Sequence, residues 1–307
     1  MNALKGIALQ LCATFLFTIM AALVRVVSVD VPTGQVMFAR SFFALFPLIA
    51  LLAFRGEISA AVRTANPVGH IIRGLVGVIG MACNFVALAR IPLVDATAIS
   101  FTTPLITVVM AALLLREVVR PYRWIAVMLG LAGVVIMLWP HLALGFGADV
   151  ASTWGAIYGL CAAICTAGAI VQVRHLTATE TTAAIVFYFQ ALASVAALGT
   201  AAWGWVVPGP GASALLLTIG FLGGVGQILL TESYRYAPAS VIAPFTYSAM
   251  LWSLVLGFAL FSEVPSLIVL VGAAIVIGAG LYMIWHERHE DEQRRREAEA
   301  SGPPPVA

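Results

Sequence analysis

The feature that most constrains this chain is a series of ten apolar runs, each long enough to form a membrane-spanning helix. A helix needs about 20 apolar residues to cross a bilayer, and short charged or Pro/Gly-rich breaks separate such runs along almost the whole sequence. Because backbone polar groups find no water in hydrocarbon, each run must form its own hydrogen bonds as a helix. The predicted spans are 5–27, 34–54, 70–89, 93–115, 122–139, 152–173, 182–203, 213–233, 238–261 and 265–285.

Composition agrees with an all-α integral membrane protein. Hydrophobic residues make up 62% and charged residues 10% of the 307 residues, compared with about 45–50% and about 25% in soluble domains. These values exclude a water-soluble enzyme, and the net charge of +2 excludes nucleic-acid binding as a main role. The four cysteines lie within apolar runs, where we expect neither disulfides nor a metal site. We also expect no cofactor.

Basic residues predict how the spans are oriented. If the N-terminus is inside, most of the 16 Lys and Arg lie on the inner side, and the long outer connections 140–151 and 204–212 contain none. Cytoplasmic segments carry such an excess of positive charge. We therefore predict a multi-pass protein of the bacterial inner membrane, with cytoplasmic N- and C-termini and a cytoplasmic tail at 287–307.

The second half of the chain repeats the first. A shift of 146 residues aligns glycines and a glutamate, and a shift of 149 aligns cysteine and arginine. The aligned pairs are Gly74/Gly220, Gly77/Gly223, Gly80/Gly226, Glu117/Glu263, Cys12/Cys161 and Arg25/Arg174. Since five spans are an odd number, the second copy enters the membrane from the opposite side. We predict two inverted five-helix repeats, 4–139 and 152–286, around a central cavity, as in carriers that work by alternating access.

With these features the chain resembles the EamA-type carriers of the drug/metabolite transporter superfamily over residues 4–286. The residues that carry the resemblance are Arg40, Pro104, Leu105, Glu117, Gly130, Gly133, the stretch 226–244, Glu263, Val264 and Pro265. The resemblance implies that spans 1–4 and 6–9 surround the cavity and that spans 5 and 10 are peripheral. It also implies a broad-specificity amino-acid exporter, including export of aromatic amino acids. Uptake of riboflavin or S-adenosylmethionine is the alternative.

Two hydroxyl–aromatic–hydroxyl triplets are candidate substrate contacts. The shift of 146 aligns Ser100-Phe101-Thr102 with Thr246-Tyr247-Ser248. A two-fold axis would bring both triplets to the cavity, where they would offer hydrogen bonds and an aromatic surface. Alternatively, the hydroxyls bond to backbone carbonyls of their own helices and allow close helix packing. The sequence leaves both interpretations open.

Three further uncharged side chains are candidates for the cavity wall. Asn84 and Gln227 are amides at membrane depth in spans 3 and 8, and both can hold a carboxylate or an ammonium group. Their alternative role is an interhelical hydrogen bond. Trp252 is a candidate aromatic wall residue, although membrane aromatics more often face lipid or fill gaps.

Arg40 is the charged candidate, about 9 Å inside the start of span 2 at 1.5 Å per residue. A charge in hydrocarbon is unfavourable and is a functional hypothesis by default, and a guanidinium can receive a substrate carboxylate through two hydrogen bonds. The alternative, which we favour from the sequence, is that Arg40 extends to the outer surface or pairs with Asp30 or Asp95.

The positions of the acidic residues bear on the transport mechanism, and those of the histidines bear on whether the chain is an enzyme. Proton-driven carriers generally need a titratable relay in the membrane, and the predicted spans hold no deep Asp or Glu. We therefore expect facilitated transport or exchange by a monomer in the lipid bilayer, with a small molecule as its substrate. All five histidines lie at span ends, in loops or in the tail, which disfavours an intramembrane enzyme. A structural or sensory membrane protein is the remaining alternative.

Overall fold

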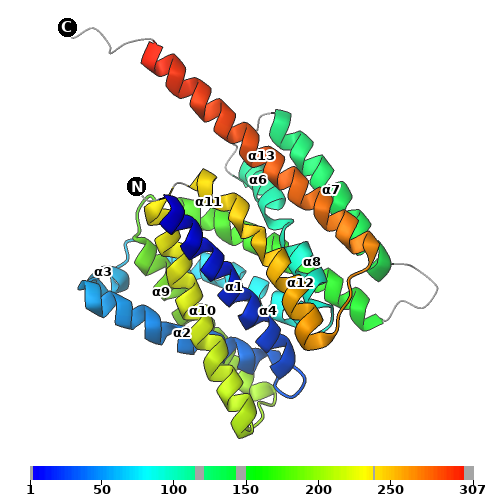
Figure 1. Ribbon diagram of the computed structural model, residues 1–307. Helices are drawn as coiled ribbons and strands as arrows, with labels where there is room; N and C mark the ends of the chain where they lie inside the picture. The colour runs from blue at the N-terminus through cyan, green and yellow to red at the C-terminus, as the bar shows by residue number, and fades with distance from the viewer. Residues whose placement is uncertain (1–2, 115–120, 143–149, 238, 301–307) are drawn as a thin grey trace.

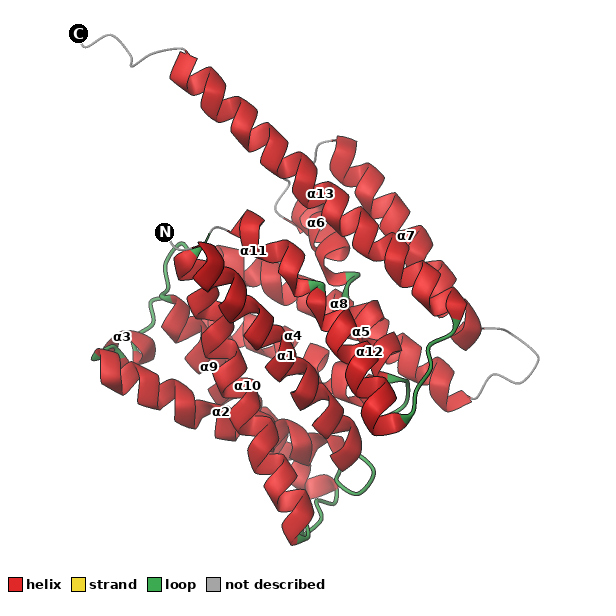
Figure 2. Ribbon diagram, in the orientation of Figure 1, coloured by secondary structure: helices red, strands yellow, loops and turns green. Residues whose placement is uncertain are grey.

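The computed structural model describes residues 3–114, 121–142, 150–237 and 239–300. Within these ranges the ordered elements are helices, with no strand (Figure 2). Ten apolar helical segments of the described chain are long enough to cross a membrane. The fold class predicted from the sequence, a ten-helix all-α membrane protein, is confirmed.

The helices follow the predicted spans to within a few residues at most ends. The first five spans are α1 (Ala3–Val27), α2 (Thr33–Arg55), α4 (Pro67–Leu88), α5 with α6 (Leu93–Ser100 and Thr103–Leu114) and α7 (Pro121–Leu142). The second five are α8 (Val150–Leu176), α9 (Thr182–Gly199), α10 (Pro210–Tyr236), α11 with α12 (Ala239–Thr246 and Ser248–Phe261) and α13 (Leu267–Ala300). Two short helices, α3 (Ile58–Val62) and the 3₁₀ helix η1 (Thr200–Trp203), lie in connections.

Two spans that the sequence predicts as continuous helices are broken. The fourth breaks between α5 and α6, and the ninth breaks at Tyr247 between α11 and α12. Pro104, just after the first break, lacks the backbone N–H that would bond to the carbonyl of Ser100, and its ring crowds that carbonyl. Pro244 lies inside α11, three residues before the second break. Both breaks fall within the two aligned triplets, so the triplet hydroxyls lie where helical hydrogen bonding is interrupted.

Helix packing follows the predicted correspondence between the halves. α1 packs on α10, and their counterparts α8 and α4 also pack on each other, while α2 packs on α9. α7 and α13 run side by side along one flank, and the last part of α13 projects beyond the other helices (Figure 1). This is the peripheral place that the resemblance implies for spans 5 and 10. The exact repeat boundaries, 4–139 and 152–286, stay a prediction.

Glycines allow the closest helix contacts. A Cβ atom at Gly133 would lie 2.8 Å from the carbonyl oxygen of Gly272, and one at Gly272 would lie 2.7 Å from that of Gly133. The backbones of α7 and α13 therefore touch directly, as small residues permit in membrane proteins. On α4, Gly77 faces the ring of Phe189, with 2.7 Å between an added Cβ and that ring. The glycine runs act in packing.

At the C-terminal end of α1, the carboxylate of Glu263 connects the ends of three helices. Glu263, just after α12, forms an ion pair with Arg25 of α1 and accepts a hydrogen bond from the backbone N–H of Leu93 at 3.0 Å. The Arg25 guanidinium also lies 4.6 Å from the ring centroid of Phe261. Glu263 therefore satisfies a backbone donor at the start of α5. Glu117, its sequence counterpart, lies outside the described residues.

A second carboxylate ties the connections at the opposite helix ends. Glu180 accepts hydrogen bonds at 2.8 Å from the Thr64 hydroxyl and from the backbone N–H groups of Ala65 and Asn66, and it lies 3.4 Å from Nε2 of His70. Desolvation raises the pKa of Glu180, but the hydrogen bonds outweigh it and hold that pKa below its ordinary value. The carboxylate thus fixes the segment before α4.

Candidate functional site

A cavity of about 320 Å³ lies among α1, α2, α4, α5, α6, α8 and α9, and we call it the Arg40 cavity. Its size is at the lower end of the roughly 300–1,000 Å³ range of ligand pockets. The polar residues of its lining are Arg40, Arg73, Asn84, Ser100, Thr103 and Thr166. Aromatic surface comes from Phe85 and Phe189, and no lining residue is acidic. The described helices α10 to α13 contribute no lining residue, although the resemblance implies that spans 8 and 9 surround the cavity.

Arg40 faces this cavity from α2 and is only 9% exposed. Its Nη1 donates a hydrogen bond to Oε1 of Gln190 at 2.7 Å, and Gln190 is itself 2% exposed. The structure therefore does not show the pairing with Asp30 or Asp95 that we favoured from the sequence. Asp95 lines a different cavity, of about 260 Å³, beside Glu263. A neutral acceptor on α9 holds the guanidinium, and no acid of the described residues forms an ion pair with it.

Arg73 is a lining residue that the sequence analysis missed, because we assigned it to the inner end of span 3. The helix begins earlier than predicted: Asn66 caps it by accepting a hydrogen bond from the N–H of Gly69 at 2.9 Å, and Pro67 occupies the first turn. Arg73 thus lies about 9 Å inside α4. The Asn-Pro pair was the sequence signal that could have placed it there.

The Arg73 guanidinium stacks on an aromatic ring in the cavity. Its Cζ lies 3.8 Å from the ring centroid of Phe189, within the range of a cation–π contact. Its Nε and Nη1 atoms are buried and have no hydrogen-bond partner in the described structure. Two donors of a charged group therefore have no acceptor among the residues that the structure describes.

The two amides that we predicted for the wall of one cavity line two different cavities. Asn84 lines the Arg40 cavity, whereas Gln227 lines a larger cavity between α2, α9 and α10. The correspondence between spans 3 and 8 put both amides on equivalent helix faces, but the cavities on these faces are not equivalent. Only Asn84 lies beside Arg40 and Arg73.

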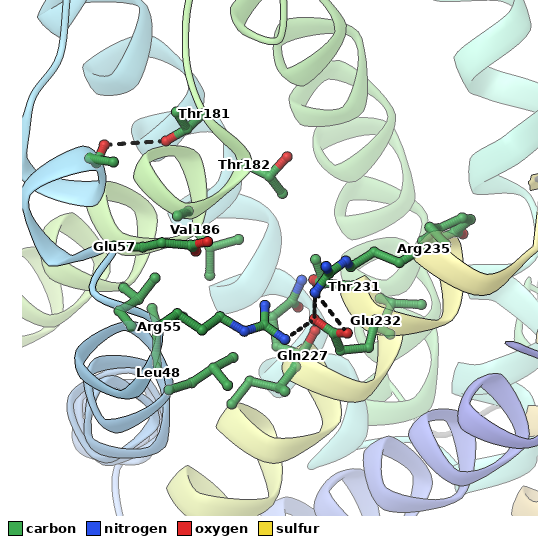
Figure 3. Close-up of a pocket in the computed structure, with 17 residues that line it drawn as sticks. Leu48, Arg55, Glu57, Thr181, Thr182, Val186, Gln227, Thr231, Glu232 and Arg235 are labelled. Carbon is green, nitrogen blue, oxygen red and sulfur yellow. Dashed lines mark hydrogen bonds and ion pairs between the residues drawn. The ribbon is translucent and has the colours of Figure 1, made fainter. Parts of the chain in front are cut away.

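We call the larger cavity, of about 830 Å³, the Arg55 groove. Figure 3 shows Arg55, Glu232 and Arg235 converging at its wall. Glu232 accepts a hydrogen bond from Arg55 at 2.7 Å and from Arg235 at 3.2 Å, and leucines of α2 form much of the apolar lining. Although the groove is larger, its arginines already have a carboxylate. We therefore place the candidate site in the Arg40 cavity.

In the first triplet only Ser100 lines the Arg40 cavity, and its hydroxyl donates to the carbonyl of Thr97 at 2.6 Å. The Thr102 hydroxyl donates to the carbonyl of Ile99 at 2.8 Å. The Phe101 ring meets the Tyr247 ring edge-on, with centroids 5.0 Å apart. The aromatic members of the two triplets therefore contact each other, but neither of them lines the cavity.

The hydroxyls of the second triplet belong to the contact with α1. Thr246 accepts a hydrogen bond from Gln10 at 3.0 Å, and the hydroxyls of Ser248 and Thr14 lie 2.9 Å apart. These bonds match the packing interpretation of the triplet. Direct contact of Thr246, Tyr247 and Ser248 with a substrate stays a prediction, which their position outside the cavity lining does not favour.

Trp252 also lies outside both cavity linings. Its ring meets Phe15 edge-on at 5.0 Å between centroids, and its buried indole N–H has no hydrogen-bond partner in the described chain. Its aromatic contact joins α12 to α1. The described residues contain no group of three His, Cys, Asp or Glu that could hold a metal ion.

Comparisons with known proteins agree with this architecture. The EamA-like transporter family matches residues 4–139 and 153–285. The chain is 32% identical to the pseudopaline exporter CntI of Pseudomonas aeruginosa over 90% of this chain and 94% of the relative. It is 30% identical to an S-adenosylmethionine uptake transporter of Rickettsia bellii, over 83% and 84% of the two chains. It is 29% identical to a riboflavin transporter of Rhizobium johnstonii, over 76% of each.

One solved crystal structure is similar in fold, with a TM-score of 0.64 and 22% identity. The match covers 92% of this chain and 94% of the other.

Proposed function

Because the chain belongs to the EamA-like transporter family, whose members here are membrane carriers of small metabolites, we propose that it exports amino acids and related carboxylates. It does so as a monomer across the bacterial inner membrane, with both termini in the cytoplasm. Export rather than uptake is supported by the similarity to an exporter at 32% identity. A sensory or structural role, and intramembrane catalysis, have no comparable support.

The observation that carries this proposal is the buried Arg40 guanidinium in the wall of a ligand-sized cavity. Gln190 occupies one of its donors and orients the group. The remaining donors can bind a carboxylate through charge-assisted hydrogen bonds. Asn84 and the nearby hydroxyls supply oxygen acceptors for an ammonium group. An amino acid presents both of these groups.

The proposed mechanism is alternating access between two inverted repeats. The tie of Glu263 to Arg25 and Leu93 joins α1, α5 and α12 at one end of the bundle, where one gate has to open. No acid lines the Arg40 cavity, so a proton relay through its wall has no candidate residue. The substrate gradient, or exchange for another solute, supplies the driving force.

Uptake of S-adenosylmethionine or riboflavin is the second candidate. It is favoured by relatives with these names at 30% and 29% identity. The phenylalanines in the cavity lining offer these larger aromatic solutes a surface for stacking.

Transport by the purified protein in sealed liposomes tests the proposal. Labelled Phe, Thr and Met are compared with S-adenosylmethionine and riboflavin, with and without an imposed pH gradient. We expect saturable exchange of the amino acids that does not need the pH gradient. If only riboflavin or S-adenosylmethionine is transported, the assignment changes from amino-acid exporter to uptake carrier. Flux that scales with the pH gradient would contradict a mechanism driven by the substrate gradient or by exchange.

Arg40→Gln tests the observation that carries the proposal. We expect exchange to fall by about 10- to 100-fold, because hydrogen bonds to charged groups contribute roughly 1.5–3 kcal/mol. Arg63→Gln is the matched control, since Arg63 is exposed in the connection before α4. Equal loss in both variants would show that the effect does not come from the cavity.

A further inference from the structure

Two guanidinium groups share the Arg40 cavity, and neighbouring residues of one helix hold them. On α9, Phe189 stacks on Arg73 at 3.8 Å and Gln190 accepts a hydrogen bond from Arg40 at 2.7 Å. Both arginines belong to the same cavity wall. The two positive charges therefore face the same cavity from α2 and α4.

Two other arginines at helix ends show what Arg40 and Arg73 lack. Arg25 is paired with Glu263, and Arg55 is paired with Glu232. Neither Arg40 nor Arg73 has an acid within ion-pair distance among the described residues, and the cavity lining holds no Asp or Glu. The two guanidinium groups also repel each other electrostatically. A buried charge is unfavourable without a partner of opposite sign.

Arg73 is not simply reaching towards water. A long basic side chain near a helix end usually keeps its charged head solvated. In Arg73, however, Nε and Nη1 are buried and have no hydrogen-bond partner among the described residues, and the guanidinium lies over the Phe189 ring. Stacking leaves the in-plane donors of a guanidinium available, and these are the atoms that bind a carboxylate.

We propose that Arg73 forms a second anion subsite and that the preferred substrates are amino acids with two acidic groups. This inference rests on the proposed function, in which Arg40 receives the first carboxylate. The second carboxylate binds Arg73, while Asn84, Thr103 and Thr166 surround the ammonium group between them. Such a substrate supplies both of the negative charges that the cavity lining lacks.

The pair glutamate and glutamine tests the second subsite. The two solutes have nearly the same shape and differ by one negative charge. In sealed liposomes that contain the purified full chain, we expect counterflow of labelled glutamate to exceed that of labelled glutamine by at least about tenfold, because charged hydrogen bonds are much stronger than neutral ones. Arg73→Gln should abolish this preference, so that the ratio of glutamate to glutamine counterflow falls to about one. Arg73→Lys should retain part of it.

Two controls separate a subsite from a structural effect. Arg40→Gln should reduce counterflow of both solutes, because both have an α-carboxylate. Arg63→Gln, in the exposed connection before α4, should change neither. Equal counterflow of glutamate and glutamine in the native chain would overturn the proposal. So would an equal loss of both in Arg73→Gln with normal folding. If Arg73→Gln does not fold, the ratio of glutamate to glutamine counterflow in the native chain and in Arg73→Lys still tests the proposal.

A binding measurement distinguishes failure of this inference from failure of the proposed function. Glutarate and its monoamide have no amino group, and their binding to the detergent-purified protein can be followed by thermal stabilisation. Stabilisation by glutarate that Arg73→Gln abolishes would support the anion subsite even if no amino acid is transported. Exchange of Phe, Thr and Met without any preference for glutamate or glutarate would support the exporter and overturn the second subsite.

Discussion

The Arg40 cavity and the Arg55 groove each contain two arginines, but only the groove provides a carboxylate for them. Glu232 accepts hydrogen bonds from both Arg55 and Arg235, whose side chains are 33% and 61% exposed. Arg40 is 9% exposed and is held by an uncharged amide. Glu232 pairs with the arginines of the groove, whereas the described lining of the Arg40 cavity offers its arginines no carboxylate. The comparison shows that a ligand site is marked by the missing partner rather than by the number of charges or the size of the space.

The largest expected effect comes from giving the cavity the carboxylate that it lacks. Thr166 lines it from α8, and Thr166→Asp would place an acid opposite the arginines. We expect amino-acid exchange in liposomes to fall by about 10- to 100-fold, because an internal carboxylate competes with the substrate for charged hydrogen bonds. Thr166→Asn is the uncharged control. If the two variants lose activity equally, size rather than charge is responsible.

A smaller effect should follow from moving the support of Arg73. A Cβ atom at Gly77 would lie 2.7 Å from the Phe189 ring, so Gly77→Ala displaces the ring on which Arg73 stacks. We expect a loss of exchange of about threefold, smaller than that of Arg40→Gln, because overpacking shifts the ring but leaves the charge of Arg73 in the cavity. In Gly168→Ala, the matched control, the nearest contact would be an ordinary 3.5 Å. Similar exchange rates in the two variants would argue against a role for the ring.

Glu180 is a carboxylate whose hydrogen-bond partners are all residues of this chain, so we expect it to act on stability rather than on transport. Its pKa is lower in the folded state than in the unfolded state, so its contribution to stability is complete above about pH 4.5, the ordinary value, and is lost as the pH falls through the lower folded value. Glu180→Gln should reduce the melting temperature at neutral pH and make the melting temperature depend less on pH in the acidic range. Exchange should be unchanged. Melting curves of detergent-purified protein between pH 3 and 7 measure it, with Glu57→Gln as the control. A transport defect without a change in melting temperature would contradict this role.

The smallest effect is expected in the groove. Glu232→Gln leaves Arg55 and Arg235 without a carboxylate, but both are partly solvated and exposed ion pairs contribute only about 0–1 kcal/mol. Exchange should stay within about twofold of the native rate, as measured in liposomes beside Arg40→Gln. A loss as large as that of Arg40→Gln would show that the groove, too, belongs to the transport path.

The sequence predicts the spans well because length and apolarity alone decide whether a segment can cross a bilayer. It predicts side-chain positions less well. Because α4 begins at Pro67, Arg73 lies about 9 Å along the helix and lines the cavity. Thr246 and Ser248, on either side of the break at Tyr247, bond to α1. Alignment of the halves pairs Asn84 with the region of Gln227, yet only one of them reaches the Arg40 cavity. A repeat preserves helix order, whereas small differences in rotation and packing decide which residues meet.

The uncompensated charges of Arg40 and Arg73 have a consequence for membrane voltage. On the proposed cycle, an empty carrier reorients with two fixed positive charges in its cavity. A carrier loaded with an amino acid that has two carboxylates and one ammonium group carries only one net positive charge there. Moving one elementary charge across 100 mV changes the free energy by about 2.3 kcal/mol. The membrane potential would therefore act more strongly on the return of the empty form than on the loaded form. Exchange, in which the protein never reorients empty, would be less sensitive to voltage than net export.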